Sequence, residues 1–237
     1  MEKKNKKMKL WKKVLLICLA VVAVSVAAVA VWQRNNIAAV VETLSNSDEQ
    51  IAEKLDKNKK ELEEELKDKY PSIISDFTAE EEKKIMKGEL SVEDAVSNLN
   101  KEYESVRGKY NVKSTGNAET DKKVDKLIGD KVIELYSLKA YYLGQLGQLE
   151  ATAKREYAAL PDSQKNLSGK KTIVARHMGQ ANSLLSQCDS KVSSLLASLQ
   201  SELKACGGDT SIIKTIQSAY ENEKALKKAY YLKLLGQ

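Results

Sequence analysis

A run of 19 residues without a charged side chain, residues 14–32, constrains this chain more than any other feature of its sequence. As an α-helix, the run extends close to the roughly 30 Å of a bilayer's hydrocarbon core. Trp11 and Trp32 bracket it, and indole rings favour the two headgroup layers of a membrane. The later apolar segments are amphipathic. The sequence therefore predicts a single transmembrane helix over residues 14–32.

The charges beside this run predict its orientation. Residues 1–13 form a basic tip with seven lysines and one glutamate, which accounts for the whole formal net charge of +6. Because positively charged flanks stay in the cytoplasm, we expect a single-pass cell-membrane protein with a cytoplasmic N-terminus and an extracytoplasmic C-terminus. The other 32 basic and 32 acidic side chains cancel, so no nucleic-acid-binding face is expected.

A cleavable signal peptide is the alternative interpretation of the same segment. The sequence Ala28-Val29-Ala30 fits a small-x-small cleavage site, and cleavage after Ala30 would release a secreted helical factor. The apolar run continues through this site to Trp32 without a polar breaker, which favours a retained signal anchor.

The composition predicts an all-α fold, since the chain has two prolines, one phenylalanine and an abundance of good helix formers. Residues 33–70 are predicted to form a charged helical stalk with a short heptad pattern, in which Asn58 is a polar core position. The pattern leaves open a homo-oligomeric coiled coil through residues 37–66 and a helix that packs on its own chain. Ser47 and Gln50 have the spacing of a capping box, so a helix break near residues 45–48 competes with a continuous stalk helix.

Residues 71–110 are predicted to form a short helical segment. The stalk helix should end at Tyr70, because a residue before proline is disfavoured in the α conformation. Thr78 and Glu81 have the spacing of a second capping box, which predicts a helix that ends near Gly88. The glycine-containing residues 111–118 are predicted to be a linker.

The last part of the chain, residues 119–237, is predicted to form an antiparallel three-helix bundle. Its helices are expected at about 119–160, 168–206 and 210–235, each with one stripe of apolar side chains at every third or fourth position. None of these helices can bury its stripe alone, and the turns between them are short.

One decapeptide occurs twice. KAYYLGQLGQ at residues 139–148 returns as KAYYLKLLGQ at residues 228–237. Glycine inside a helix costs about 1 kcal/mol relative to alanine, so the two internal glycines of the first copy predict a bend or the close approach of another backbone. We interpret the repeat as a packing or partner surface, and a ligand pocket between its tyrosines is the alternative. The candidate residues are Tyr141, Tyr142, Gly144, Gly147, Tyr230 and Tyr231.

Sequence motifs for chemistry are lacking. His177 is the single histidine and has no cysteine or carboxylate within one helical turn that would complete a metal site. Cys188 and Cys206 are expected about 27 Å apart on one helix, too far for a disulfide. The acidic run at residues 80–82 is interpreted as a solvated helix face. No catalytic residue, cofactor or metal is predicted, and the chain is not expected to be an enzyme.

These features predict a membrane-tethered helical scaffold or adaptor for another envelope protein, with an envelope ligand-binding or sensing module as the alternative. Residues 14–134 carry a net charge of −6 and residues 135–237 a net charge of +6. Such asymmetry favours attraction between the two halves, or binding of the outer half to anionic envelope polymers.

Overall fold

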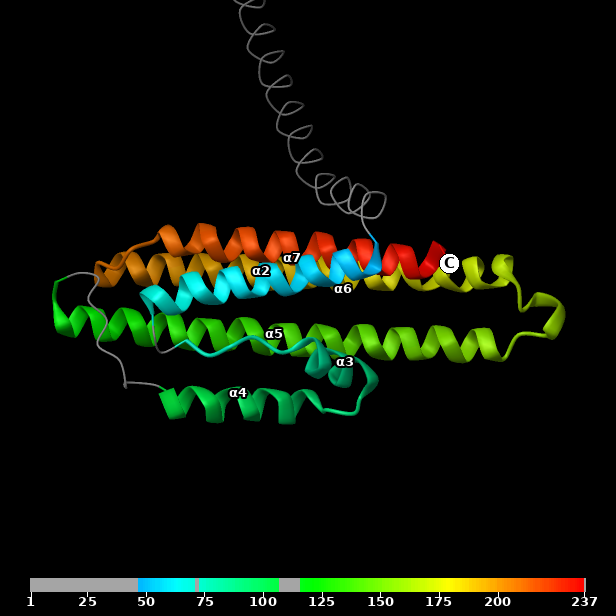
Figure 1. Cartoon of the computed structure of the whole chain (residues 1–237), viewed down its shortest axis with the longest axis horizontal. Helices are drawn as coiled ribbons and strands as arrows, with labels where there is room; N and C mark the ends of the chain where they lie inside the picture. Colours follow the sequence, from blue (N-terminus) through cyan, green and yellow to red (C-terminus); the bar gives the residue numbers. More distant parts are fainter. Residues whose placement is uncertain (1–46, 71–72, 107–115, 237) are drawn as a thin grey trace, which may run out of the picture. The chain divides into compact units, whose positions relative to one another are not determined.

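Figure 1 shows the computed structural model of the chain, which describes residues 47–70, 73–106 and 116–236. Within these residues the fold is all-α, with six α-helices and no strand. None of these helices is both long and apolar enough to span a lipid bilayer. The predicted transmembrane helix 14–32 and the basic tip 1–13 lie outside the described residues, as does the predicted linker up to residue 115.

The chain divides into two compact units. Glu53–Tyr220 form the larger unit, and Met1–Ala52 with Glu221–Gln237 form the other. The core of the larger unit is an apolar cluster with contributions from all six helices. Its most deeply buried large side chains are Leu66, Tyr70, Ile74, Val124, Ile128, Leu199, Leu203 and Ile212.

Helix α2 (Asp48–Lys69) begins at the predicted capping box. The Ser47 amide donates to Gln50 Oε1 over 2.7 Å, and the Gln50 amide donates to Ser47 Oγ over 3.2 Å. From Glu53 onward α2 packs on its own chain, because Asn58 Nδ2 donates to the Ala219 carbonyl over 3.1 Å. Asn58, the polar position of the heptad pattern, therefore binds a backbone carbonyl of α7 in the same molecule.

Two short helices follow, α3 (Ala79–Lys87) and α4 (Val92–Val106). The predicted capping box of α3 is confirmed, since the Glu81 amide donates to Thr78 Oγ1 and the Glu81 side chain accepts from the Thr78 amide. The predicted helix end is also confirmed at Gly88, whose φ of +71° is a conformation that glycine adopts without strain.

Three long helices complete the chain: α5 (Ala118–Ala158), α6 (Leu167–Cys206) and α7 (Ser211–Gly236). Their bounds lie within two residues of the predicted ones. Asn117 caps α5, and Gly207 ends α6 at a φ of +77°. The turn between α5 and α6 contains a single 3-10 turn, η1 (Asp162–Gln164).

Helix α5 is the central element of the larger unit. It contacts α6 on one side and α3 and α4 on another (Figure 1). The prediction of one apolar stripe was therefore incomplete, because a helix with neighbours on two sides must bury two faces. The predicted stripe began with Val124, Ile128, Leu135, Leu138 and Tyr142. The buried hydrophobic residues that it missed are Val132, Tyr136, Ala140 and Leu143.

Candidate functional site

Two lysines and two carboxylates meet inside the larger unit, and we call them the ion cluster: Lys59, Asp76, Glu82 and Lys139. Their side chains are only 12–14% exposed. Lys59 lies on α2, Glu82 on α3 and Lys139 on α5, whereas Asp76 lies in the segment just before α3. The cluster therefore joins α2 and α5 to α3 and to the segment that precedes it.

Both lysines bind the same carboxylate. Lys139 Nζ lies 2.8 Å from Glu82 Oε1 and 2.5 Å from Asp76 Oδ2. Lys59 Nζ forms an ion pair with Glu82 Oε1 and also donates to the Phe77 carbonyl over 3.0 Å. Each cation thus has oxygen acceptors from the chain itself, as a charge that is largely removed from water requires.

Local structure orients the two carboxylates. Glu82 lies in the first turn of α3, where the positive end of the helix dipole favours a negative charge. Asp76 Oδ1 accepts a hydrogen bond of 2.7 Å from the Phe77 amide, which fixes the carboxylate against its own backbone. The interpretation of residues 80–82 as a solvated face was wrong for Glu82, because α3 turns this residue toward α2 and α5.

A second polar contact ties the same segment to α2. Ser75 Oγ donates to Glu63 Oε1 over 2.6 Å, and Lys67 Nζ donates to Ser75 Oγ over 3.0 Å. Burial opposes ionisation of the Glu63 carboxyl, but the hydrogen bonds from Lys67 and Ser75 outweigh it and hold the pKa of Glu63 below its ordinary value. Residues 73–78 are thus held to α2 by charge as well as by apolar contacts.

The candidate tyrosines differ in exposure. Tyr142 is buried, whereas Tyr141 is 48% exposed, and their ring centroids lie 5.1 Å apart in an edge-to-face arrangement. Burial raises the pKa of the Tyr142 phenol. The side chains of Tyr230 and Tyr231 lie outside the described residues. The structure therefore brings together only the first pair.

The two candidate glycines are packing positions. A Cβ atom on Gly147 would lie 1.9 Å from the Met86 carbonyl oxygen, so the backbone of α3 crosses α5 at this residue. A Cβ atom on Gly144 would lie 3.0 Å from Cγ2 of Val92, the first residue of α4. The predicted close approach of another backbone is confirmed at Gly147, and at Gly144 the near neighbour is a side chain.

A polar contact that the sequence did not indicate joins α7 to α6. The Tyr220 hydroxyl donates to Asp189 Oδ1 over 2.6 Å and lies 3.5 Å from Cys188 Sγ. Burial, together with the hydrogen bond to the Asp189 carboxylate, raises the pKa of the Tyr220 phenol. Cys188 and Cys206 are both free thiols.

Replacement of Tyr220 by phenylalanine should lower the free energy of unfolding by about 1–2 kcal/mol, because the Asp189 carboxylate loses a donor in a half-buried place. Urea unfolding followed by circular dichroism measures the change. Tyr141→Phe is the matched control and should change the free energy by less than about 0.5 kcal/mol, since Tyr141 is exposed. Equal effects of the two substitutions would contradict a stabilising role for the Tyr220 hydroxyl.

The single histidine lies on α6 and contacts the end of α5. His177 Nε2 is 3.2 Å from Glu156 Oε2, and His177 Nδ1 is 3.2 Å from Gln180 Oε1. Arg176 Nη1 binds the same Glu156 oxygen over 2.9 Å. The two contacts with Glu156 join the end of α5 to α6, which is a structural role.

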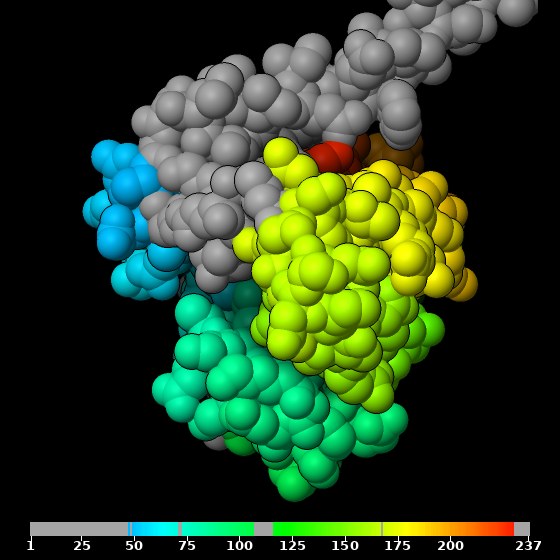
Figure 2. Space-filling model, turned by 90° about the vertical axis from the view of Figure 1, so that its right-hand side faces the viewer, coloured from blue at the N-terminus to red at the C-terminus, as the bar shows by residue number. Residues whose placement is uncertain are grey.

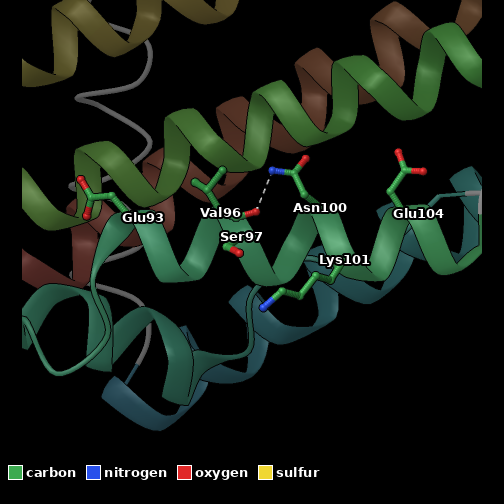
Figure 3. A pocket seen from close by; sticks show the side chains of 6 residues that line it. All are labelled: Glu93, Val96, Ser97, Asn100, Lys101 and Glu104. Carbon is green, nitrogen blue, oxygen red and sulfur yellow. Dashed lines mark hydrogen bonds between the residues drawn. The ribbon is translucent and has the colours of Figure 1, made fainter.

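The larger unit has a surface hollow of about 610 Å³ along α4. The described residues that line it all belong to this helix, and Figure 3 shows their side chains: Glu93, Val96, Ser97, Asn100, Lys101 and Glu104. Asn100 Nδ2 donates to the Val96 carbonyl of its own helix over 3.0 Å. The hollow is thus an open depression on the surface, and neither Tyr141 nor Tyr142 lines it.

Comparison with protein-family models, with curated proteins and with solved structures gives no match for this chain.

Proposed function

We propose that this chain is a single-pass membrane-anchored protein of the cell envelope whose extracytoplasmic helical domain acts as a scaffold or adaptor for another protein. In this proposal residues 14–32 are the transmembrane anchor, residues 33–70 the stalk and residues 119–237 an antiparallel three-helix bundle. The uncharged run and its lysine-rich flank support the anchor and its orientation.

The observation that carries the scaffold proposal is the ion cluster. Its two lysines bind carboxylates and a carbonyl of the chain's own segments, so these charges hold helices together. Burial of four charges contributes little net stability compared with apolar packing, but it penalises other arrangements of the helices. A defined helical frame is what a scaffold requires, because a partner surface must keep its shape.

The exposed member of the tyrosine pair supports a partner surface. Tyr141 is the exposed large hydrophobic side chain of the described residues, and the ring of the buried Tyr142 holds it edge to face. Tyrosine is enriched where proteins bind one another, since it offers apolar area and a hydroxyl at a small cost in side-chain entropy.

The membrane topology gives the first test. Protease added to intact cells should digest the C-terminal half of the chain, and the full-length chain should remain in the membrane fraction after carbonate extraction. Protection of the C-terminal half in intact cells, with digestion after the cells are opened, would contradict the proposed orientation. A mature N-terminus at Val31 would instead establish cleavage and secretion.

Site-specific crosslinking tests the adaptor role. A photo-crosslinking amino acid at position 141 of the full chain should give an adduct with one defined envelope protein in intact cells. The same probe at Gln200, an exposed position on α6, is the control and should not give this adduct. An identical set of adducts from both positions would mean that Tyr141 marks no partner surface.

A further inference from the structure

Basic side chains gather around the turn between α5 and α6. Residues 151–176 contain six basic and two acidic side chains, which gives a net charge of +4. Residues 14–237 as a whole have a net charge of zero. We call these cations the basic turn: Lys154, Arg155, Lys165, Lys170, Lys171 and Arg176. Figure 2 faces this end of the helix pair, where residues 161–166 are exposed.

Several of these cations are available to an external anion. Arg155 and Lys171 are exposed and make no ion pair within the described part of the chain; Arg155 binds only Ala151 and Thr152 of its own helix. Lys154 and Lys165 form ion pairs with Glu150 and Asp162 in which at least one partner is largely exposed. Such surface pairs contribute about 0–1 kcal/mol and exchange readily for another anion.

The backbone adds to the positive potential. The N-terminus of the 40-residue helix α6 lies in this turn, and its first turn holds no acidic residue. The partial positive charge of a helix start is therefore not compensated by a carboxylate of the same helix, and it favours a nearby anion. Asn166 caps α6 through a hydrogen bond of 3.1 Å from the Gly169 amide, which fixes the helix start in the turn.

The described side chains at positions 162–166 favour a soluble polymer over a lipid surface. A protein segment that binds a bilayer by insertion presents aromatic or aliphatic side chains together with its cations. Tyr141, which lies outside residues 151–176, is the exposed large hydrophobic among the described side chains. The exposed residues at positions 162–166 are all polar or charged.

We propose that the basic turn binds a phosphate-bearing polyanion, a polymer with repeated phosphate groups. The guanidinium of Arg155 presents a planar fork that matches phosphate oxygens. Each lysine adds an ammonium group at the end of a flexible side chain. This binding is a second activity, independent of the partner surface at Tyr141. In the proposed topology the turn faces the envelope, where such a polymer is reached without crossing the membrane.

Short-chain inorganic polyphosphate is the probe for the test, with the full chain in neutral detergent micelles. The seven lysines of residues 1–13 are replaced by glutamine in every form, because this other lysine cluster would bind polyanions by itself. Fluorescence anisotropy should show binding at about 50 mM salt that weakens steeply as salt rises. The double variant Arg155→Gln/Lys171→Gln should bind about tenfold more weakly and with a smaller salt dependence.

The control variant carries the same change of charge elsewhere. Lys57→Gln/Lys60→Gln alters two exposed lysines of α2 and should change the affinity less than about twofold. Equal weakening by both double variants, or no binding to polyphosphate, would overturn the proposal. Binding to phosphatidylglycerol vesicles but not to polyphosphate would assign the turn to lipid headgroups. Equal binding of polyglutamate would show that the turn does not select phosphate.

Discussion

Replacement of Lys139 by methionine is expected to lower the free energy of unfolding by about 3 kcal/mol. The substitution keeps most of the side-chain volume but removes the cation that contacts both Asp76 and Glu82. Two carboxylates that are only 12–13% exposed would each lose an ion pair, and Glu82 would keep the one with Lys59. Removal of one partner from a buried ion pair typically costs about 3–5 kcal/mol, and the slight exposure of this cluster lowers the expected value.

An exposed pair on the same molecule provides the control. On α2, Lys57 Nζ lies 3.7 Å from Glu61 Oε1, and the two side chains are 73% and 65% exposed. Lys57→Met should therefore change the free energy of unfolding by less than about 0.5 kcal/mol. Urea unfolding of the two variants, followed by circular dichroism, measures the difference. If Lys139→Met were as stable as Lys57→Met, the ion cluster would not hold the four segments together.

Replacement of Gly147 by alanine should destabilise the chain by about 2 kcal/mol. The new methyl group would meet the backbone of α3 at Met86, with the carbonyl oxygen 1.9 Å away. A backbone cannot rotate aside as a flexible side chain can, so α3 must move off α5. Overpacking of this kind typically costs about 1–3 kcal/mol, and the better helix propensity of alanine offsets only part of it.

The same substitution elsewhere should have the opposite sign. Gly179 lies inside α6, and nothing lies within 4 Å of a Cβ atom built on it. Gly179→Ala should therefore stabilise the chain by about 0.5–1 kcal/mol, which is the helix propensity gain alone. Thermal unfolding of both variants should move the midpoint down for Gly147→Ala and up for Gly179→Ala. A rise for both would mean that α3 does not pack tightly at Gly147.

The helix bounds could be predicted because the signals that set them are local. Thr78 and Glu81 satisfy each other's backbone within four residues, and Gly88 and Gly207 adopt positive φ values whatever lies across the molecule. The close approach at Gly147 could also be anticipated as one reason for a glycine inside a helix, although Gly179 in α6 has no such contact. These inferences required no knowledge of which helices are neighbours.

The ion cluster could not be predicted, because each member looks like a surface charge in its own segment. Lys59 lies in a run of charged residues, and Glu82 belongs to a triple glutamate. Only the tertiary fold brings them together, and that depends on contacts between residues 23 to 63 positions apart. The second buried face of α5 was missed for the same reason, since Tyr136 and Leu143 face helices whose position the local pattern does not give.

The ion cluster has a consequence for how the helices align. Helices that pack only through apolar side chains can slide past one another by a whole turn, about 5.4 Å, and still bury those side chains. A slide of α3 along α5 would move Glu82 away from Lys139. Both charges would then be largely buried without this ion pair. Apolar contacts alone would differ little in energy between the aligned and the slid arrangement. The ion cluster therefore makes misaligned forms of this chain less stable.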